Sequence, residues 1–415
     1  MMPFVAILRL IRPWLWIKFY RVKQDRIGNQ TMEFAVCQTE LAHRFMPKTD
    51  KCRELIVFYA GVEENGKYVA NKFLLKLIKR EKMSARFSWL LTKFCNYLRD
   101  FHEVFGGGGF ILSYPDAFLA SESEFAFVKY PPLFRLRSSD VKKGEYELEK
   151  FFRCGRDAQI VTFFNRDSAY VESLKDIFGD NAKHAAYCHS NRNSSIRNLH
   201  EAMILMSKKY FCFRMGKFVL EPLGLKQDNL VDYATSEYRS DFLDIYIFAK
   251  SRFYIGDESG INIVPCIFRK SIGLINGQIS ECFAALYGGD TRKSLPRHLI
   301  GQTLIPQKYY STKRDRLLNL SEIVALAASY ENATLLMTSC DKYGFKLIKN
   351  TPQEILDLTL EVEKKANDEW EEDYDHFKRE DEFWKIMGAP YKSKDRFLFP
   401  RIGNQYLKEN EWLLQ

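Results

Sequence analysis

The hydrophobic residues between positions 145 and 280 form short apolar runs separated by polar turns, a pattern that predicts strands alternating with helices. Four runs have the length and the aromatic or β-branched content of buried strands: residues 159–164, 210–216, 253–255 and 271–276. Apolar positions at helical spacing lie between them: residues 196–209, 242–249 and 261–268. Because parallel strands are joined by helical crossovers, this order predicts a Rossmann-like α/β layer.

The regions on either side predict a second α/β domain and a helical C-terminal region. Candidate strands and helices of the earlier domain are residues 33–37, 55–59, 69–82 and 88–105. The glycines at 106–109 lack a Walker pattern, so they predict a loop. After residue 350, apolar residues at helical spacing predict acidic helices. In two-domain folds a C-terminal helix often crosses back to the first domain, and we expect this here. The expected division is therefore 1–30, 31–144, 145–350 and 351–415.

Polar and cationic residues follow the predicted strands of the 145–350 domain where the strands end. The carboxyl ends of parallel strands share one edge of a sheet, which is where open α/β sheets bind ligands. Cations and helix N-termini attract phosphate at such an edge. The candidates for binding a diphosphate are Arg166, Arg192, Arg214, Glu258, Ser259 and Gly260. An ordinary loop in which Ser259 caps the next helix is the alternative.

Two further candidates precede the helix at 242–249. Tyr238 offers an aromatic ring and Arg239 a cation, and together they suit the base or ribose of a nucleotide. The alternative is that both side chains pack between helices.

Five motifs carry a resemblance to a known family: NRDSAY at 165–170, HSNRNSSIRNLHEA at 189–202, FRMG at 213–216, the segment 231–260 and VPCIFRKSIGLIN at 264–276. With them, the chain resembles a bacterial glycosyltransferase family of the GT-B fold, found in gene clusters for O-antigen and capsular polysaccharide. The resemblance runs from about residue 33 to the carboxyl end. It implies two Rossmann-like domains that face a cleft. It also implies a nucleotide-sugar donor and a saccharide or lipid-linked acceptor.

More remotely, the second half is similar to heptosyltransferases, in which an acidic-x-Ser-Gly turn faces the donor diphosphate. Those enzymes have His after the turn, whereas this chain has Ile261 and Asn262.

Composition narrows the class of protein. The chain has 415 residues, of which 46% are hydrophobic, enough for two domain cores. Its nine cysteines form no CxxC pairs, which favours reduced core residues in a cytoplasmic protein. The net charge of +9 comes without any nucleic-acid-binding motif, so we expect no nucleic-acid partner.

The N-terminal segment 1–30 combines tryptophans and aliphatic residues with several cations. Charges and Pro13 interrupt it too often for a bilayer span, and no cleavage site follows it. We expect it to lie in the headgroup layer at the inner face of the plasma membrane. The alternative is a helix packed on the protein's own surface.

Glycosyl transfer with inversion needs a base on a loop of the cleft. Glu40 and His43 follow the first predicted strand, and Asp167 lies beside Arg166. No DxD motif stands at a strand end, so the expected reaction is metal-independent and uses no cofactor besides the donor. A nucleotide-sugar epimerase or pyruvyl transferase on the same fold, and a binding subunit without turnover, are the alternatives.

Overall fold

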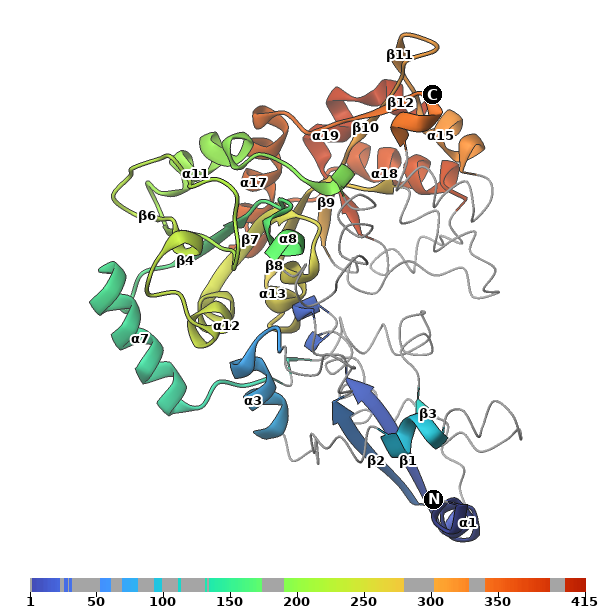
Figure 1. Ribbon diagram of the computed structural model, residues 1–415. Coiled ribbons are helices and arrows are strands. Elements are labelled where there is room, and N and C mark those ends of the chain that lie inside the picture. Colours follow the sequence, from blue (N-terminus) through green and yellow to red (C-terminus); the bar gives the residue numbers. More distant parts are fainter. Residues whose placement is uncertain are drawn as a thin grey trace. The chain divides into compact units, whose positions relative to one another are not determined.

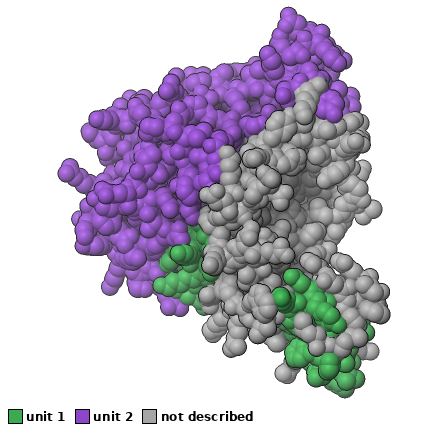
Figure 2. Space-filling view, viewed as in Figure 1, with its two compact units in different colours: residues 1–134 green, residues 135–415 purple. Residues whose placement is uncertain are grey.

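The computed structural model divides the chain into two compact units, Met1–Phe134 and Arg135–Gln415 (Figure 2). The residues that it describes are 2–22, 26–28, 30–31, 53–60, 69–80, 93–98, 111–112, 131–132, 134–173, 190–279, 302–327, 340–388 and 400–415.

The first unit contains a parallel three-stranded sheet in the order β2-β1-β3. Its strands are β1 (Leu15–Val22), β2 (Arg53–Ala60) and β3 (Ile111–Leu112), and its helices include α1 (Met2–Ile11), α3 (Lys72–Arg80) and a turn of helix at 93–98. Helix α1 packs through Val5 and Leu8 on a small core with Phe19, Cys95 and Leu98. The predicted strand at 55–59 and helix at 69–82 are confirmed, whereas the strand predicted at 33–37 lies outside the described residues.

The N-terminal segment differs from the expectation of a separate membrane-association element. Strand β1 belongs to residues 1–30 and is the central strand of the sheet, paired with β2 from Leu15 to Val22. The segment LWIKFYRV is rich in aromatic and β-branched residues, which favour a strand. The first domain therefore begins within this segment and not after it.

The second unit is built on a seven-stranded sheet in which every pair of neighbouring strands is parallel. The order is β13-β9-β8-β7-β4-β5-β6 (Figure 1). The strands are β4 (Ile160–Phe164), β5 (Phe211–Arg214), β6 (Leu230–Val231), β7 (Ser251–Asp257), β8 (Ser271–Gly277), β9 (Thr303–Pro306) and β13 (Arg401–Ile402). The first six strands follow the Rossmann order 3-2-1-4-5-6, which confirms the predicted α/β class.

Helices cover both faces of this sheet. On β7, the Tyr254 ring contacts Phe248 of α12 with centroids 6.0 Å apart. The neighbouring Phe253 contacts Tyr210, whose hydroxyl donates to Glu363 of α17. Because successive strand residues point to opposite faces, α12 and α17 lie on opposite sides of the sheet.

The helices of this unit are α7 (Ser138–Phe152), α8 (Ala169–Ser173), α11 (His200–Met206), α12 (Asp241–Lys250), α13 (Ile263–Ile267), α15 (Leu320–Leu326), α17 (Pro352–Ala366), α18 (Tyr374–Ile386) and α19 (Asn404–Glu409). A small antiparallel sheet of β10 (Lys308–Ser311), β11 (Arg316–Leu317) and β12 (Phe345–Ile348) joins β9 to α17. The boundary expected at residue 145 falls inside α7, after the unit boundary at Arg135.

The C-terminal region belongs to the second unit. Helix α17 packs on β7, β8 and β9, and β13 extends the sheet beside β9. We had expected residues 351–415 to pack on the first domain. Instead, the described part of this region completes the core of the second unit.

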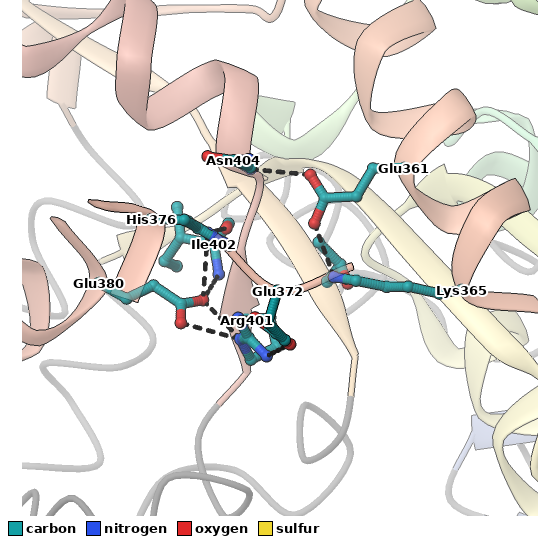
Figure 3. Close-up of polar contacts among 9 residues, drawn as sticks. Glu361, Lys365, Glu372, His376, Glu380, Arg401, Ile402 and Asn404 are labelled. Carbon is teal, nitrogen blue, oxygen red and sulfur yellow. Dashed lines mark hydrogen bonds and ion pairs between the residues drawn. The ribbon is translucent and has the colours of Figure 1, made fainter. Parts of the chain in front are cut away.

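Strand β13 is fastened by charged side chains of α18 and the segment before it (Figure 3). Arg401 lies 2.8 Å from Glu380 and 2.7 Å from Glu372. The N–H of Ile402 donates to Glu380 at 2.8 Å, and His376 Nε2 lies 2.8 Å from the Ile402 carbonyl oxygen. Side chains thus satisfy the main-chain groups of a two-residue edge strand.

Glu361 and Lys365 of helix α17 make a second set of polar contacts near β13 (Figure 3). Glu361 accepts the N–H of Asn404 at 2.8 Å and the Lys365 ammonium at 2.6 Å. Lys365 also donates to Thr303 of β9 at 2.9 Å. The last two strands of the sheet are therefore tied to one helix.

The described cysteines are free, and all lie in the interior: Cys95, Cys154, Cys212, Cys266 and Cys340. Burial raises the pKa of Cys154 and of Cys340 to about 12. These thiols are protonated near neutral pH and behave as small apolar side chains, as predicted.

Candidate functional site

The carboxyl ends of β4 and β7 form the point at which the strand order of the second unit reverses. The two strands are neighbours, but β5 follows β4 on one side of the pair and β8 follows β7 on the other. In open α/β sheets, such a reversal point at the carboxyl ends of the strands is where ligands bind. The residues predicted to bind a diphosphate were expected at this edge.

Asp257, at the end of β7, is the hub of this edge and is 1% exposed. Its carboxylate accepts hydrogen bonds from the Arg166 N–H at 2.7 Å, from Asn276 Nδ2 at 2.7 Å and from the Ser194 hydroxyl. Burial raises the pKa of Asp257, whereas these hydrogen bonds lower it. Asp257 thus holds three loops together and has little capacity left for a ligand.

Three cationic side chains gather around this hub. Arg166 donates to Asn193 Oδ1 at 2.7 Å, and Arg192 Nη2 lies 3.9 Å from Glu258 Oε1. Lys349, at the end of β12, donates to the carbonyl oxygen of Asn191. Burial lowers the pKa of Lys349 to about 8, Asp257 opposes this shift, and Arg166 and Arg192 add to it. The three cations therefore lie near enough to repel one another.

Buried amides position the loop that carries Arg192. Gln307 Nε2 donates to the carbonyl oxygens of Asn276 at 2.8 Å and Asn191 at 3.2 Å. Asn276 and Asn350 exchange two hydrogen bonds of 2.6 and 2.9 Å between side chain and main chain. Asn276 has a φ of 54°, in the left-handed region that asparagine tolerates. These amides fix the carbonyl group to which Lys349 donates.

Sequence reasoning missed Lys349, Gln307, Asn276 and Asn350 as parts of the site. They lie far from Arg166 in the chain, and only the sheet order brings them together. One local signal was present: Lys349 and Asn350 immediately precede the cap of α17 at Thr351, next to Pro352, where a strand end meets a helix start.

The Ser259 turn is partly occupied with its own capping. The Ser259 N–H donates to Asn262 Oδ1 at 3.1 Å, and a short 3-10 turn (Gly260–Asn262) leads into α13. Glu258 is buried beside Arg192. Glu258, Ser259 and Gly260 therefore lie at the predicted edge, and Ser259 also has the capping role that was the alternative.

Arg214 lies beneath the edge. Its side chain is fully buried and bonds to Asp232 at 3.0 Å, to Asn165 Oδ1 at 3.1 Å and to the Glu221 carbonyl oxygen at 3.3 Å. The guanidinium joins the ends of β4, β5 and β6, a supporting position rather than that of a cation presented to a ligand.

Asp167 is also engaged by the main chain. One carboxylate oxygen accepts the Ala169 N–H at 3.0 Å, and the other accepts the Leu220 N–H at 2.8 Å. It thus orders the loop that carries Arg166. Glu40 and His43, the other two candidate bases, lie outside the described residues.

Tyr238 and Arg239 pack with neighbouring helices. The Tyr238 ring stacks on Phe151 of α7 at 4.4 Å and is 42% exposed, and Arg239 lies 2.7 Å from Asp244 of α12. Burial raises the pKa of Asp244 to about 6, and Arg239 opposes the shift. The structure does not bring these two side chains into the cluster around Asp257.

A small cavity lies beside Glu258 at the ends of β8 and β9. It is lined largely by apolar side chains, among them Leu274, Phe383 and Trp384, and its volume is about 10 Å³. That volume suits a single water molecule and not a sugar. Among the residues that the structure describes, no group of three His, Cys, Asp or Glu side chains is arranged to hold a metal ion.

No protein-family model and no curated protein matches the chain. Among solved structures, it is similar to a UDP-GlcNAc 2-epimerase from Neisseria meningitidis bound to UDP-GlcNAc, with 11% identity and a TM-score of 0.26. The match covers 85% of this chain and 100% of that one. A TM-score this low carries no argument about the function of this chain.

Proposed function

We propose that this chain is a glycosyltransferase that moves a sugar from a nucleotide-diphosphate sugar to a saccharide or lipid-linked acceptor in bacterial surface polysaccharide synthesis. One observation supports the proposal above all. Arg166, Arg192 and Lys349 converge around Asp257 where the parallel sheet reverses its strand order. The proposal includes peripheral contact of residues 1–30 with the cytoplasmic face of the membrane.

The cations suit the chemistry of the leaving group. Glycosyl transfer from such a donor releases a nucleoside diphosphate, whose negative charge must be stabilised as the glycosidic bond breaks. Arginine pairs with phosphate oxygens through two parallel hydrogen bonds, and lysine supplies a compact charge. We assign this stabilisation to Arg166, Arg192 and Lys349, and the ordering of their loops to Asp257 and Asp167.

The first test is binding of a nucleoside diphosphate, measured by titration calorimetry with UDP, GDP and CDP. We expect one of them to bind, and we expect Arg192→Gln and Lys349→Met each to lower its affinity by about 10-fold or more. Arg252→Gln is the matched control. Arg252 lies at the amino end of β7, the strand whose carboxyl end carries Asp257, and it bonds to Asn367 there. Absence of binding, or an equal loss in the control, would contradict the site.

The second test is product analysis with the donor that binds. Release of the nucleoside diphosphate with the sugar attached to an acceptor supports transfer. An altered sugar that remains on its nucleotide would instead show an epimerase. Transfer of a pyruvyl group to a sugar would show a pyruvyl transferase, and binding without turnover would show a binding subunit.

The base is tested separately. Glu40 and His43 are the proposed groups for accepting the acceptor's proton. Glu40→Gln or His43→Gln should abolish turnover and leave diphosphate affinity unchanged, because a base acts after the donor is bound. Asp167→Asn should instead weaken diphosphate binding, since Asp167 orders the Arg166 loop.

A further inference from the structure

Helix α1 and the turn after it expose four large hydrophobic side chains. Their exposed fractions are 51% for Phe4, 51% for Ile7, 70% for Leu10 and 73% for Trp14. Ile7 and Leu10 lie at a spacing of three residues on the outward side of the helix. Phe4 lies at the margin of that side, because its ring also packs edge-on against Phe94 with centroids 5.0 Å apart. A folded protein rarely leaves such a contiguous apolar strip in water without a partner for it.

The opposite side of α1 fixes the helix in place. Val5 and Leu8 are 3% and 2% exposed and belong to the core that contains Phe19 of β1. The helix is therefore apolar on two sides. One side anchors it to the first unit, and the other is presented outward by that anchor.

Cationic residues accompany the exposed strip. Arg9 is exposed on α1, and the Arg12 guanidinium lies 4.5 Å from the centre of the Trp16 ring. Within residues 1–26 the chain has Arg9, Arg12, Lys18, Arg21, Lys23 and Arg26 against the single acidic residue Asp25. The segment is thus cationic as a whole, and the described Arg9 and Arg12 beside the strip complement a negatively charged surface.

The length of α1 decides how it meets a bilayer. Its 10 residues extend about 15 Å, roughly half of the hydrocarbon thickness. None of the described helices combines the length and hydropathy that a membrane span requires. A short helix with an apolar strip and cationic margins suits the interface between headgroups and acyl chains.

We infer that Phe4, Ile7, Leu10 and Trp14 form a docking surface for a bilayer that contains anionic lipid, with α1 lying in the plane of the interface. The apolar side chains enter the acyl boundary, and Arg9 and Arg12 meet the headgroups. Membrane contact of this kind extends the proposed function, because a lipid-linked acceptor lies in the same plane.

Point substitutions test the surface, because a deletion would also remove β1. The Gln variant, with Ile7→Gln, Leu10→Gln and Trp14→Gln, keeps Val5 and Leu8 and also Phe4, whose ring packs on Phe94, so the anchored side of the helix is intact. We measure flotation of the full chain with vesicles of phosphatidylcholine, with and without phosphatidylglycerol. The wild type should bind when phosphatidylglycerol is present, and the Gln variant should bind about 100-fold less tightly or worse.

A second variant, Arg9→Gln with Arg12→Gln, isolates the charges. It should lose about 5-fold in affinity per arginine, and the loss should shrink at high salt. The matched control is Tyr146→Gln with Tyr374→Gln. It removes two exposed aromatic rings of the second unit, 58% and 71% exposed, and should bind like the wild type.

Several outcomes would overturn the inference. Wild type that floats with neither kind of vesicle, or a Gln variant that floats like the wild type, would do so. A wild type that is dimeric by light scattering and a Gln variant that is monomeric would show that a second copy covers the strip. Diphosphate titration of the same samples keeps the result separate from the proposed function, since the Gln variant retains Arg192 and Lys349.

Discussion

Asp257 and Lys349 show how burial acts on opposite charges within one site. Burial raises the pKa of Asp257 and lowers the pKa of Lys349 to about 8. Asp257 is compensated by three hydrogen bonds, whereas the ammonium of Lys349 is disfavoured by burial and by Arg166 and Arg192, which together outweigh the attraction of Asp257. The unfavourable environment of the Lys349 charge is what a bound anion would relieve. The sequence predicted Arg166 and Arg192 because they follow strands locally, but Lys349 joins them only through tertiary structure.

The affinity for a nucleoside diphosphate should depend on pH through Lys349. The free protein has a Lys349 pKa of about 8, and a bound diphosphate raises that pKa because it stabilises the ammonium. Affinity should therefore be full below pH 8 and fall as the pH rises through and above that value. Titration calorimetry between neutral pH and pH 9.5 checks this. The affinity for the diphosphate should fall by roughly tenfold per pH unit at most. A Lys349→Met variant with the same decline would contradict it.

Gly256 should be intolerant of any side chain. A Cβ atom at this position would lie 2.5 Å from the Phe164 carbonyl oxygen and 2.6 Å from the Tyr254 hydroxyl oxygen. We expect Gly256→Ala to destabilise the protein by about 1–3 kcal/mol, because a main-chain atom in the way cannot turn aside. Gly155→Ala is the control, since nothing lies within 4 Å of the added methyl group. Chemical denaturation compares the two variants, and an equal loss in both would refute the prediction.

At the scale of elements, the two ends of the chain departed most from the sequence analysis. Strand β13 has two residues, too few for a periodic signal, and side chains of α18 together with Glu372 hold it. Strand β1 is rich in aromatic and β-branched residues, but its tryptophan and cations also suit an interfacial helix. By contrast, β4, β5, β7 and β8 were predicted because fully buried parallel strands are continuous apolar runs.

Loss of the Arg401 side chain, which ties β13 to α18, should lower the stability of the protein. Arg401→Met leaves the buried Glu380 carboxylate without its cation, so we expect the free energy of unfolding to fall by about 3–5 kcal/mol. Arg316→Met is the control, because Arg316 pairs with Glu322 at the surface and should matter little. Urea unfolding of both variants measures the difference. A loss no larger for Arg401→Met than for the control would mean that β13 is held by apolar packing alone.

At the scale of the whole molecule, the sequence predicted two α/β parts and the edge of one sheet at which a ligand would bind. The α/β class is confirmed by the parallel seven-stranded sheet of the second unit. The division was less accurate, because helix α7 starts the second unit before the expected boundary and the last residues return to the same unit. Periodicity identifies elements, but tertiary contacts decide which unit an element joins.

Deletion of residues 1–28 should therefore unfold the first unit and spare the second. The deletion removes β1, which pairs with both β2 and β3. In hydrogen exchange, amides of β2 should lose protection, whereas those of β4 and β7 should keep theirs because their partners lie within residues 135–415. Protected β2 amides in the truncated protein would show that the segment is a dispensable appendage.

Helix α17 begins just after Lys349. About 14 Å further along its axis it carries Glu361, which accepts a hydrogen bond from the N–H of Asn404 at the start of α19. A single helix, α17, thus connects Lys349 to the C-terminal end of the chain. A change at the C-terminal end, such as a fused domain or loss of the final residues, would displace α17. That displacement would shift Lys349 relative to Arg166 and Arg192. Changes at the C-terminal end would therefore alter the positions of the cations at the sheet edge.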